Sequence, residues 1–260
     1  MTAKQLIEEL MHGGITPENT CDTVKAGDPE KQLRRVAVSM FATVEVIQAA
    51  REWGADMLIT HEPTFYDHMD RIKDDPVSLS KRAMIEESGM IIFRYHDHMH
   101  FRDVDAITEG ECHYLGLEGK IEKTPYSASY ILTSDEPLTA LELAERMEKE
   151  LKISHVRIAG ARENKATRIA LCFGTPRGVF DLLKQVDVQM VLTGEACEWQ
   201  LGEYARDAAA LGINKSLIVM GHIGSERDGM RLLAERMRER YTEFETMYFE
   251  CEEVYSYTSK

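Results

Sequence analysis

Residues 36–62 read VAVSMFATVEVIQAAREWGADMLITHE, and this stretch decides the fold class. The run from Val36 to Phe41 is apolar enough for a buried strand. Val44 to Trp53 is a helix candidate that ends at Gly54, because glycine is common just past the end of a helix. Met57 to Thr60 is a second short strand. The stretch therefore predicts a strand–helix–strand unit of the kind that builds a parallel sheet.

The same alternation continues along most of the chain. Further strands are expected at 90–95, 155–158, 168–173, 188–193 and 216–220, and further helices at 75–88, 138–151, 194–211 and 226–240. We expect an α/β protein with two α/β lobes, each with a largely parallel sheet flanked by helices. Lys123, Thr124 and Pro125 mark the boundary, so residues 1–125 form the first lobe and 126–260 the second. The last helix and the alternating segment 244–251 are candidates to pack back on the first lobe.

Composition narrows the possible partners and compartment. The 45 acidic residues outnumber the 31 basic ones, which gives a net charge of -14 and argues against nucleic acid or an anionic membrane as a partner. The five cysteines form no C-x-x-C pair, which fits a reducing compartment. No segment approaches the roughly 20 apolar residues of a membrane span, and the first residues lack a signal-peptide run. We expect a cytoplasmic protein.

Three segments place histidine or carboxylate directly after an expected buried strand: THEP at 60–63, YHDHMH at 95–100 and GHIGSE at 221–226. Loops from separate strands converge at the carboxyl ends of the strands of an open α/β sheet. Imidazole together with carboxylate suits zinc, iron or manganese, whereas calcium and magnesium prefer oxygen alone. The three segments can therefore meet in one crevice, and their carboxylates and imidazoles are enough to hold two metal ions.

Each segment also has an interpretation without metal. His96, His98 and His100 alternate, so an extended chain would project them to one side, but a solvated polar hairpin would contain the same residues. Ser225 is a good helix N-cap, and Glu226 favours the first turn of a helix. Glu195 and Glu198 are better explained as acids that open a helix than as direct ligands. These alternatives stay open on the residues alone.

The same segments resemble those of the dinuclear-metal family labelled GTP cyclohydrolase I type 2, also called Nif-three-like. The resemblance spans nearly the whole chain, and four stretches carry it: AGDPE at 26–30, GADMLITH at 54–61, LTGE at 192–195, and Gly221-His222 with Glu226. It implies two α/β lobes around a dinuclear site, with two divalent ions of iron, zinc or manganese per chain. It also implies a homo-oligomer, commonly a ring-shaped hexamer.

The chain departs from the family pattern at two positions. The family has two adjacent histidines before proline, and here the second is Glu62; the family has an aspartate four residues after the middle histidine, and here His100 stands there. The swaps keep the number of each ligand type. The resemblance therefore assigns His61, His222 and Glu226 directly, and Glu62 and His100 by position, as metal ligands. It places His96 near the metals, and we assign His96 or His98 as the proton carrier.

The function we expect is a metal-dependent hydrolase that uses a metal-activated water on a nucleotide-like or other small anionic substrate. Arg94, Arg102 and Arg227 lie near the motifs and are candidates to hold the anionic group, with ordinary surface charge as the alternative. The alternative function is a non-enzymatic metal-binding oligomer that serves metal storage, delivery or regulation. Turnover that is lost in His222→Ala would distinguish the enzyme.

Overall fold

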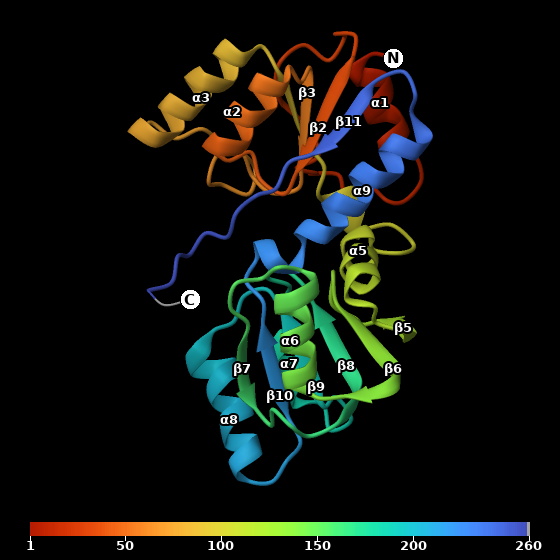
Figure 1. The fold of residues 1–260 in the computed structure, drawn as a ribbon, viewed down its shortest axis with the longest axis vertical. Coiled ribbons are helices and arrows are strands. Elements are labelled where there is room, and N and C mark those ends of the chain that lie inside the picture. Colours follow the sequence, from red (N-terminus) through yellow and green to blue (C-terminus); the bar gives the residue numbers. More distant parts are fainter. Residues whose placement is uncertain (259–260) are drawn as a thin grey trace. The chain divides into compact units, whose positions relative to one another are not determined.

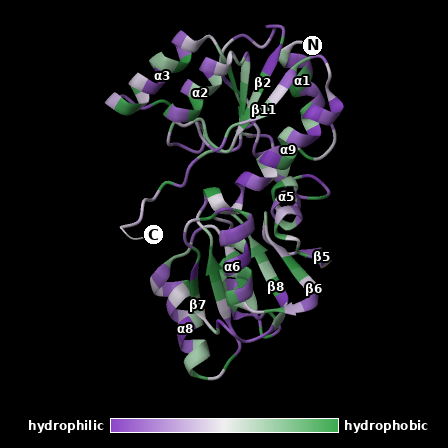
Figure 2. Ribbon diagram, viewed as in Figure 1, coloured by the Kyte–Doolittle hydropathy of each residue, from purple (hydrophilic) through white to green (hydrophobic). Residues whose placement is uncertain are grey.

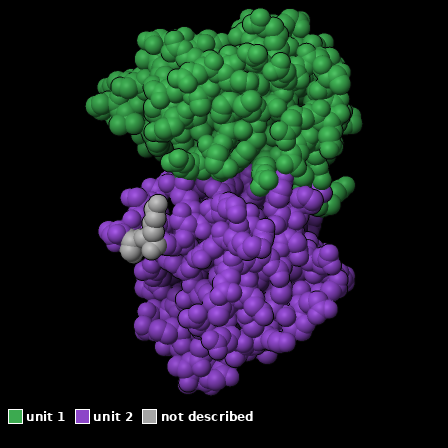
Figure 3. Space-filling model, in the orientation of Figure 1, with its two compact units in different colours: residues 1–106, 229–252 green, residues 107–228, 253–260 purple. Residues whose placement is uncertain are grey.

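The computed structural model describes residues 1–258, and the chain divides into two compact units. Unit 1 holds residues 1–106 and 229–252, and unit 2 holds residues 107–228 and 253–258 (Figure 3). Residues 107–125 precede the boundary expected at Pro125, and they belong to unit 2. Each unit contains its own sheet, with helices against it (Figure 1). The two α/β sheets expected from the alternating pattern are therefore confirmed.

The sheet of unit 1 has the order β1-β4-β3-β2-β11. Its strands are β1 (Val24–Ala26), β2 (Arg35–Ser39), β3 (Met57–Thr60), β4 (Ile91–Arg94) and β11 (Glu245–Tyr248). The pairs β4–β3, β3–β2 and β2–β11 are parallel, and only the edge strand β1 pairs antiparallel, on β4. The sheet is therefore largely parallel, and the last strand of the chain completes it beside β2.

The helices of unit 1 are α1 (Ala3–Leu10), α2 (Val44–Trp53), α3 (Pro76–Ser88), the short α4 (Asp97–His100) and α9 (Arg227–Arg240), which belongs to this unit from Gly229 onward. Helix α2 has the bounds that the sequence predicts. Its first turn is capped by the Thr43 hydroxyl, which accepts from the Val46 amide at 3.1 Å. It ends at Gly54, whose φ of 81° suits a residue without a side chain.

The core of unit 1 lies on both faces of its central strands. All four residues of β3 and all four of β4 are buried. Strands that are covered on both faces read as continuous apolar runs, because no position alternates toward solvent. This is why the short segments around 57–60 and 90–95 can be recognised from the sequence.

The sheet of unit 2 has the order β5-β6-β8-β9-β10-β7. Its strands are β5 (Gly119–Lys123), β6 (Tyr130–Leu138), β7 (Arg157–Gly160), β8 (Ala166–Cys172), β9 (Met190–Thr193) and β10 (Ser216–Val219). Only β8–β9 and β9–β10 are parallel, whereas β5–β6, β6–β8 and β10–β7 are antiparallel. The expectation of a largely parallel second sheet is wrong, because three of its five strand pairs are antiparallel.

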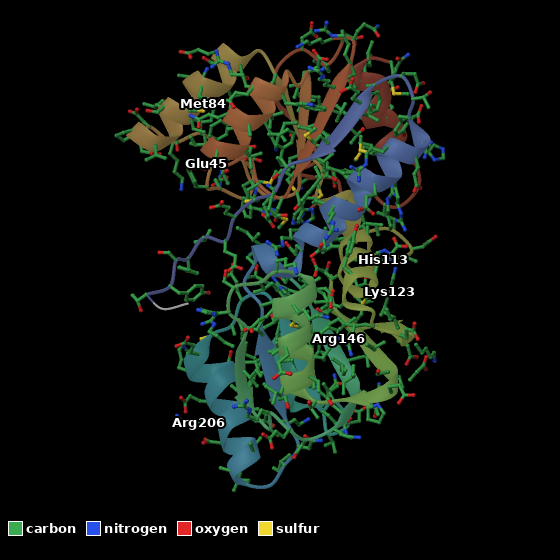
Figure 4. All side chains as sticks on the ribbon, viewed as in Figure 1. Glu45, Met84, His113, Lys123, Arg146 and Arg206 are labelled. Carbon is green, nitrogen blue, oxygen red and sulfur yellow. The ribbon has the colours of Figure 1, made fainter. Side chains whose placement is uncertain are left out.

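The helical segments of unit 2 are α5 (Ala106–Leu115, in this unit from Ile107), α6 (Ala140–Glu150), α7 (Val179–Lys184), the π-helix η1 (Glu198–Gly202), α8 (Glu203–Ala210) and the 3₁₀ turn η2 (Ile223–Ser225). Figure 2 shows mainly hydrophobic strands and helices of mixed hydropathy. On α8, Ala205 and Ala208 are buried, whereas Arg206 is exposed (Figure 4). No helix among residues 1–258 is long and apolar enough to cross a membrane.

Candidate metal centre

Strands β3 and β4 deliver the candidate ligands of unit 1 to one edge of the sheet. The two strands are parallel and in register, with Thr60 opposite Arg94 at their carboxyl ends. His61 follows β3 directly, and His96 follows β4 after one residue. The Tyr95 amide donates to the Thr60 carbonyl at 2.7 Å, which extends the pairing to the point where both segments leave the sheet. The strand-end rule therefore brings the first two motifs together as expected.

The YHDHMH segment is a single helical turn, α4, and not an extended chain. The Asp22 carboxylate holds the first turn: Oδ1 accepts from the amides of His96 and Asp97 at 2.7 and 2.9 Å, and Oδ2 accepts from the amide of His98 at 2.7 Å. A carboxylate at a helix N-terminus satisfies amides that have no partner within the helix. On a helix, residues four apart share a face. The turn therefore puts His96 and His100 on one side and directs His98 elsewhere.

His61, His96 and His100 form a compact cluster, which we call the three-histidine cluster. One ring nitrogen from each lies within 4.8 Å of those of the other two. The His61 and His96 rings stack with 4.5 Å between centroids, and His100 meets them edge-on at 5.0 and 4.9 Å. Three imidazoles this close suit a shared cation, because cationic rings would repel one another.

The hydrogen bonds of the cluster fix which nitrogen of each ring can coordinate a metal. His61 Nδ1 donates to the Tyr95 carbonyl at 3.1 Å, and His100 Nδ1 donates to Asp105 Oδ2 at 2.9 Å. His96 Nδ1 donates to Asp97 Oδ1 at 2.9 Å. Carbonyl and ionised carboxylate oxygens can only accept, so Nδ1 carries the proton in each ring. The lone pair is then on Nε2, which is the arrangement found in histidines that bind metals.

Burial favours the neutral, metal-binding form of His61. Its side chain is fully buried beside two other imidazoles, and burial first and then the charges of His96 and His100 hold its pKa well below the usual 6.5. Glu62 is also nearly buried, and its Oε1 lies 3.7 Å from His96 Nε2. The structure thus places Glu62 beside the cluster, as the substitution in the family motif suggests.

His98 lies outside the three-histidine cluster. Its Nδ1 is 3.2 Å from the Thr16 hydroxyl, and its ring stacks on Tyr95 with 6.0 Å between centroids. Burial first and then Arg102 lower its pKa. The expectation that alternate histidines share a side is wrong, because it assumed an extended chain.

Unit 2 contains the third motif, where β10 ends and η2 begins. His222 Nδ1 donates to Glu195 Oε1 at 2.7 Å, and His222 Nε2 lies 3.1 Å from Glu226 Oε2. Glu195 therefore orients the ring from behind and leaves Nε2 toward Glu226. Glu195 thus contacts the His222 ring, and this role differs from the helix-opening role that the sequence suggests for it.

Ser225 and Gly174 set the position of Glu226. The Ser225 hydroxyl accepts from the Gly174 amide at 3.0 Å and donates to the His222 carbonyl at 2.9 Å. It therefore joins the loop after β8 to the turn after β10. Gly174 has a φ of 65°, and a side chain there would overlap the Glu226 carboxylate. The backbone is thus able to approach the carboxylate only because residue 174 is glycine.

The three arginines proposed as anion ligands have structural roles. Arg94 is fully buried, and its Nε donates to the His61 carbonyl at 3.0 Å. Another of its nitrogens donates to the His68 carbonyl. Arg102 donates to the Leu10 carbonyl, and the buried Arg227 donates to the Leu151 carbonyl. Arg94 is not a surface charge, and two of its nitrogens hold the backbone on which the cluster rests.

Sequence reasoning missed Asp22, Asp105 and His68. Asp22 and Asp105 hold the histidines in place. His68 forms a second group of possible metal ligands together with Cys21 and Asp97. None of them occurs at a ligand spacing along the chain, so no signal in the sequence singles them out.

Comparison with known proteins agrees with this geometry. The model of the family described as Duf34/NIF3 (NGG1p interacting factor 3) matches residues 18–255. The chain belongs to this family. The resemblance that the motifs indicate is therefore confirmed, and the fold is similar to that of solved structures that include a protein related to NIF3.

Relatives and solved structures of this family match over most of their length. A protein of Clostridium perfringens called GTP cyclohydrolase 1 type 2 homolog is 24% identical over 221 residues, with 82% of this chain and 81% of the relative covered. A Pseudomonas aeruginosa protein with the same description is 26% identical, with coverage of 85% and 84%. The fold is similar to that of a Staphylococcus aureus protein, with a TM-score of 0.77, 17% identity and 99% coverage of both chains.

Proposed function

We propose that this protein is a metal-dependent hydrolase whose ions are held by His61, Glu62 and His100 in unit 1 and by His222 and Glu226 in unit 2. One observation carries the proposal. Each of these histidines donates from Nδ1 to a carbonyl or carboxylate oxygen, at 3.1 Å for His61, 2.9 Å for His100 and 2.7 Å for His222. Metal-binding histidines almost always donate their other ring N–H to such an oxygen, which orients the ring. The donor set suits iron, zinc or manganese, and we propose two divalent ions per chain.

Divalent ions at these ligands would supply a water acidic enough to ionise near neutral pH and would polarise the electrophilic centre of the substrate. The chain's own groups do the rest. His96 is half-buried, 3.7 Å from Glu62, and is held by Asp97, so it is placed to carry a proton at Nε2. We assign the proton transfer to His96, since His98 lies against Thr16 and Tyr95.

The proposed substrate is a nucleotide-like or other small anion. The name of the relatives, GTP cyclohydrolase 1 type 2 homolog, makes a purine nucleotide the first compound to test. We also propose that the protein acts in the cytoplasm as a homohexamer and without nucleic acid or membrane partners; its net charge of -14 supports the last point. Light scattering coupled to size exclusion tests the assembly.

The decisive experiment combines metal analysis with turnover. Protein purified without an affinity tag is analysed for bound metals as wild type, as the His61→Ala/Glu226→Ala double variant, and as His113→Ala. His113 is exposed on α5 and serves as the control (Figure 4). We expect wild type and His113→Ala to hold about two equivalents of metal more than the double variant.

Hydrolysis of GTP, phosphodiesters and phosphoanhydrides is then compared between wild type and His222→Ala. Turnover that disappears in His222→Ala, with unchanged circular dichroism, supports the hydrolase. Full metal loading with no turnover of any of these compounds would refute the hydrolase and leave a metal-binding protein for storage, delivery or regulation.

A further inference from the structure

Unit 1 contains a second group of ligand atoms, formed by Cys21, His68 and Asp97, that shares no residue with the three-histidine cluster. The Cys21 sulfur, a His68 ring nitrogen and an Asp97 carboxylate oxygen all lie within 4.8 Å of one another. Cys21 comes from the loop before β1, His68 from the loop after β3 and Asp97 from the start of α4. Three segments that are distant in sequence thus bring one thiol, one imidazole and one carboxylate together.

We propose that Cys21, His68 and Asp97 bind one zinc-class divalent ion, as a site separate from the three-histidine cluster. A sulfur, nitrogen and oxygen donor set suits zinc, cobalt or cadmium, and not magnesium or calcium. Water completes a four-coordinate site that has three protein ligands. Cys21 binds as the thiolate, so its proton passes to solvent when the ion enters.

The distances allow coordination after a small movement. Tetrahedral ligands at about 2.0–2.3 Å from zinc lie roughly 3.5 Å from one another, so a 4.8 Å spread needs a shift of about 1 Å. His68 is the residue able to make this shift, because its side chain is exposed whereas Cys21 is buried. The exposed imidazole also provides a route for an ion to reach the buried thiol.

Neighbouring contacts hold the other two donors in place. Asp97 Oδ2 accepts from the Thr20 hydroxyl at 2.9 Å and from the Cys21 amide at 3.1 Å, so the carboxylate and the cysteine move together. The backbone of His68 is held by Arg94, which donates to its carbonyl. Asp22 is close to the Cys21 sulfur, at 3.8 Å, but its oxygens already accept from three amides, so we do not count it as a ligand.

The two sites communicate through one hydrogen bond. Asp97 Oδ1 accepts from His96 Nδ1 at 2.9 Å, and the His68 and His96 rings meet edge-on at 5.9 Å. An ion bound to Asp97 attracts the negative charge of this carboxylate, so Asp97 becomes a weaker acceptor for the His96 Nδ1–H group. Occupancy of the second site thus changes the electrostatic environment of the three-histidine cluster without using any of its ligands.

Cobalt(II) titration of the metal-free, full-length protein tests the proposal, because cobalt bound by thiolate absorbs in the near ultraviolet and cobalt bound by histidine and carboxylate does not. All variants contain Cys197→Ser, which removes the exposed thiol. We expect a thiolate band whose final intensity corresponds to one thiolate-bound cobalt per chain. It should vanish in Cys21→Ser, and His68→Ala should weaken the affinity by at least ~10-fold, since a lost ligand costs more than a lost outer contact.

Two further variants separate this site from the proposed function. The band should persist in His61→Ala/His100→Ala, which removes ligands of the three-histidine cluster, and in the exposed control His113→Ala. If Cys21→Ser does not fold, as judged by circular dichroism, His68→Ala decides. No thiolate band at saturating cobalt, or a band that survives Cys21→Ser or is unchanged in His68→Ala, overturns the proposal. Cobalt that binds without a thiolate band would refute this site alone and leave the three-histidine cluster supported.

Discussion

Asp70 joins two buried cations in unit 1, and replacing it should destabilise this unit more than any surface ion pair would. Its Oδ2 lies 3.1 Å from Lys25 Nζ and 3.5 Å from an Arg94 nitrogen, and the exposed fractions of the three side chains are 3%, 8% and 0%. Its Oδ1 accepts from the Phe65 amide at 3.0 Å. Asp70→Asn keeps the amide contact, and asparagine tolerates the φ of 58° at this position. The variant therefore keeps the size of the side chain but removes its charge, and its amide nitrogen, which can only donate, replaces the oxygen that faces Lys25 and Arg94.

Removing one partner of a buried ion pair costs about 3–5 kcal/mol, because the other charge stays buried. With a urea m value of about 2 kcal/mol/M, a loss of about 4 kcal/mol lowers the unfolding midpoint by about 2 M. Asp70→Ala should be worse by about 1–3 kcal/mol, since the Phe65 amide then loses its acceptor. The urea concentration at the unfolding midpoint should therefore be highest for wild type, lower for Asp70→Asn and lowest for Asp70→Ala.

Urea unfolding followed by tryptophan fluorescence measures the effect in the correct unit. Trp53 lies in unit 1 and Trp199 in unit 2, so the Trp199→Phe background leaves a reporter for unit 1 alone. Glu86→Gln is the control, because it breaks an exposed pair with Arg82 at 2.7 Å and should change stability by less than about 0.5 kcal/mol. If Asp70→Asn unfolds at the same urea concentration as Glu86→Gln, the electrostatic argument is wrong.

Three further predictions follow from local geometry. Gly174→Ala should lower the melting temperature and the metal content more than Gly212→Ala does. Both glycines have positive φ, but only a side chain at residue 174 would overlap the Glu226 carboxylate. Equal effects of the two substitutions would contradict this overlap. A thiol reagent should modify the native protein at one cysteine, the exposed Cys197. The other cysteines are buried, and burial raises the pKa of Cys21 and Cys172 to about 12. Rapid modification of two or more cysteines, or modification that persists in Cys197→Ser, would be inconsistent with this burial. Burial lowers the pKa of Lys81 from 10.5 to about 8, so the unfolded state binds more protons than the folded state between these two pH values. The free energy of unfolding should therefore rise by about 3 kcal/mol between pH 8 and 10.5. Urea unfolding at both pH values tests this, and the rise should be missing in Lys81→Met.

The central strands and helices of both units could be predicted from the sequence, because burial on both faces leaves a visible pattern. Strands β3, β4, β9 and β10 are short apolar runs with every residue buried, and α2 carries its own cap and stop. The direction of the edge strands could not be predicted. Strand β7 is four residues long and only partly buried, and nothing in it indicates that it pairs antiparallel with β10.

The candidate site could be predicted as far as the strand-end rule reaches. His61 and His96 follow neighbouring parallel strands, so their proximity follows from the topology. The helical turn α4 could not be predicted, because its N-terminal amides are satisfied by Asp22, which is 74 residues earlier in the chain than His96. The ring orientations of His100 and His222 depend on hydrogen bonds to Asp105 and Glu195, and these contacts exist only in the folded protein. The ligand assignments themselves stay predictions until metal is measured.

The contacts of Asp22 have a consequence for how an ion would bind. Because this carboxylate immobilises the turn of His96 and His100 through three amide contacts, the histidine backbone is ordered before any ion arrives. Little conformational entropy then remains to be lost on binding, and the affinity depends mainly on the bonds to the ion. Loading should stabilise unit 1 by mass action on an already folded state, and not by inducing its fold. A shortened chain that starts after residue 22 would lose this preorganisation while it keeps every proposed ligand of the three-histidine cluster.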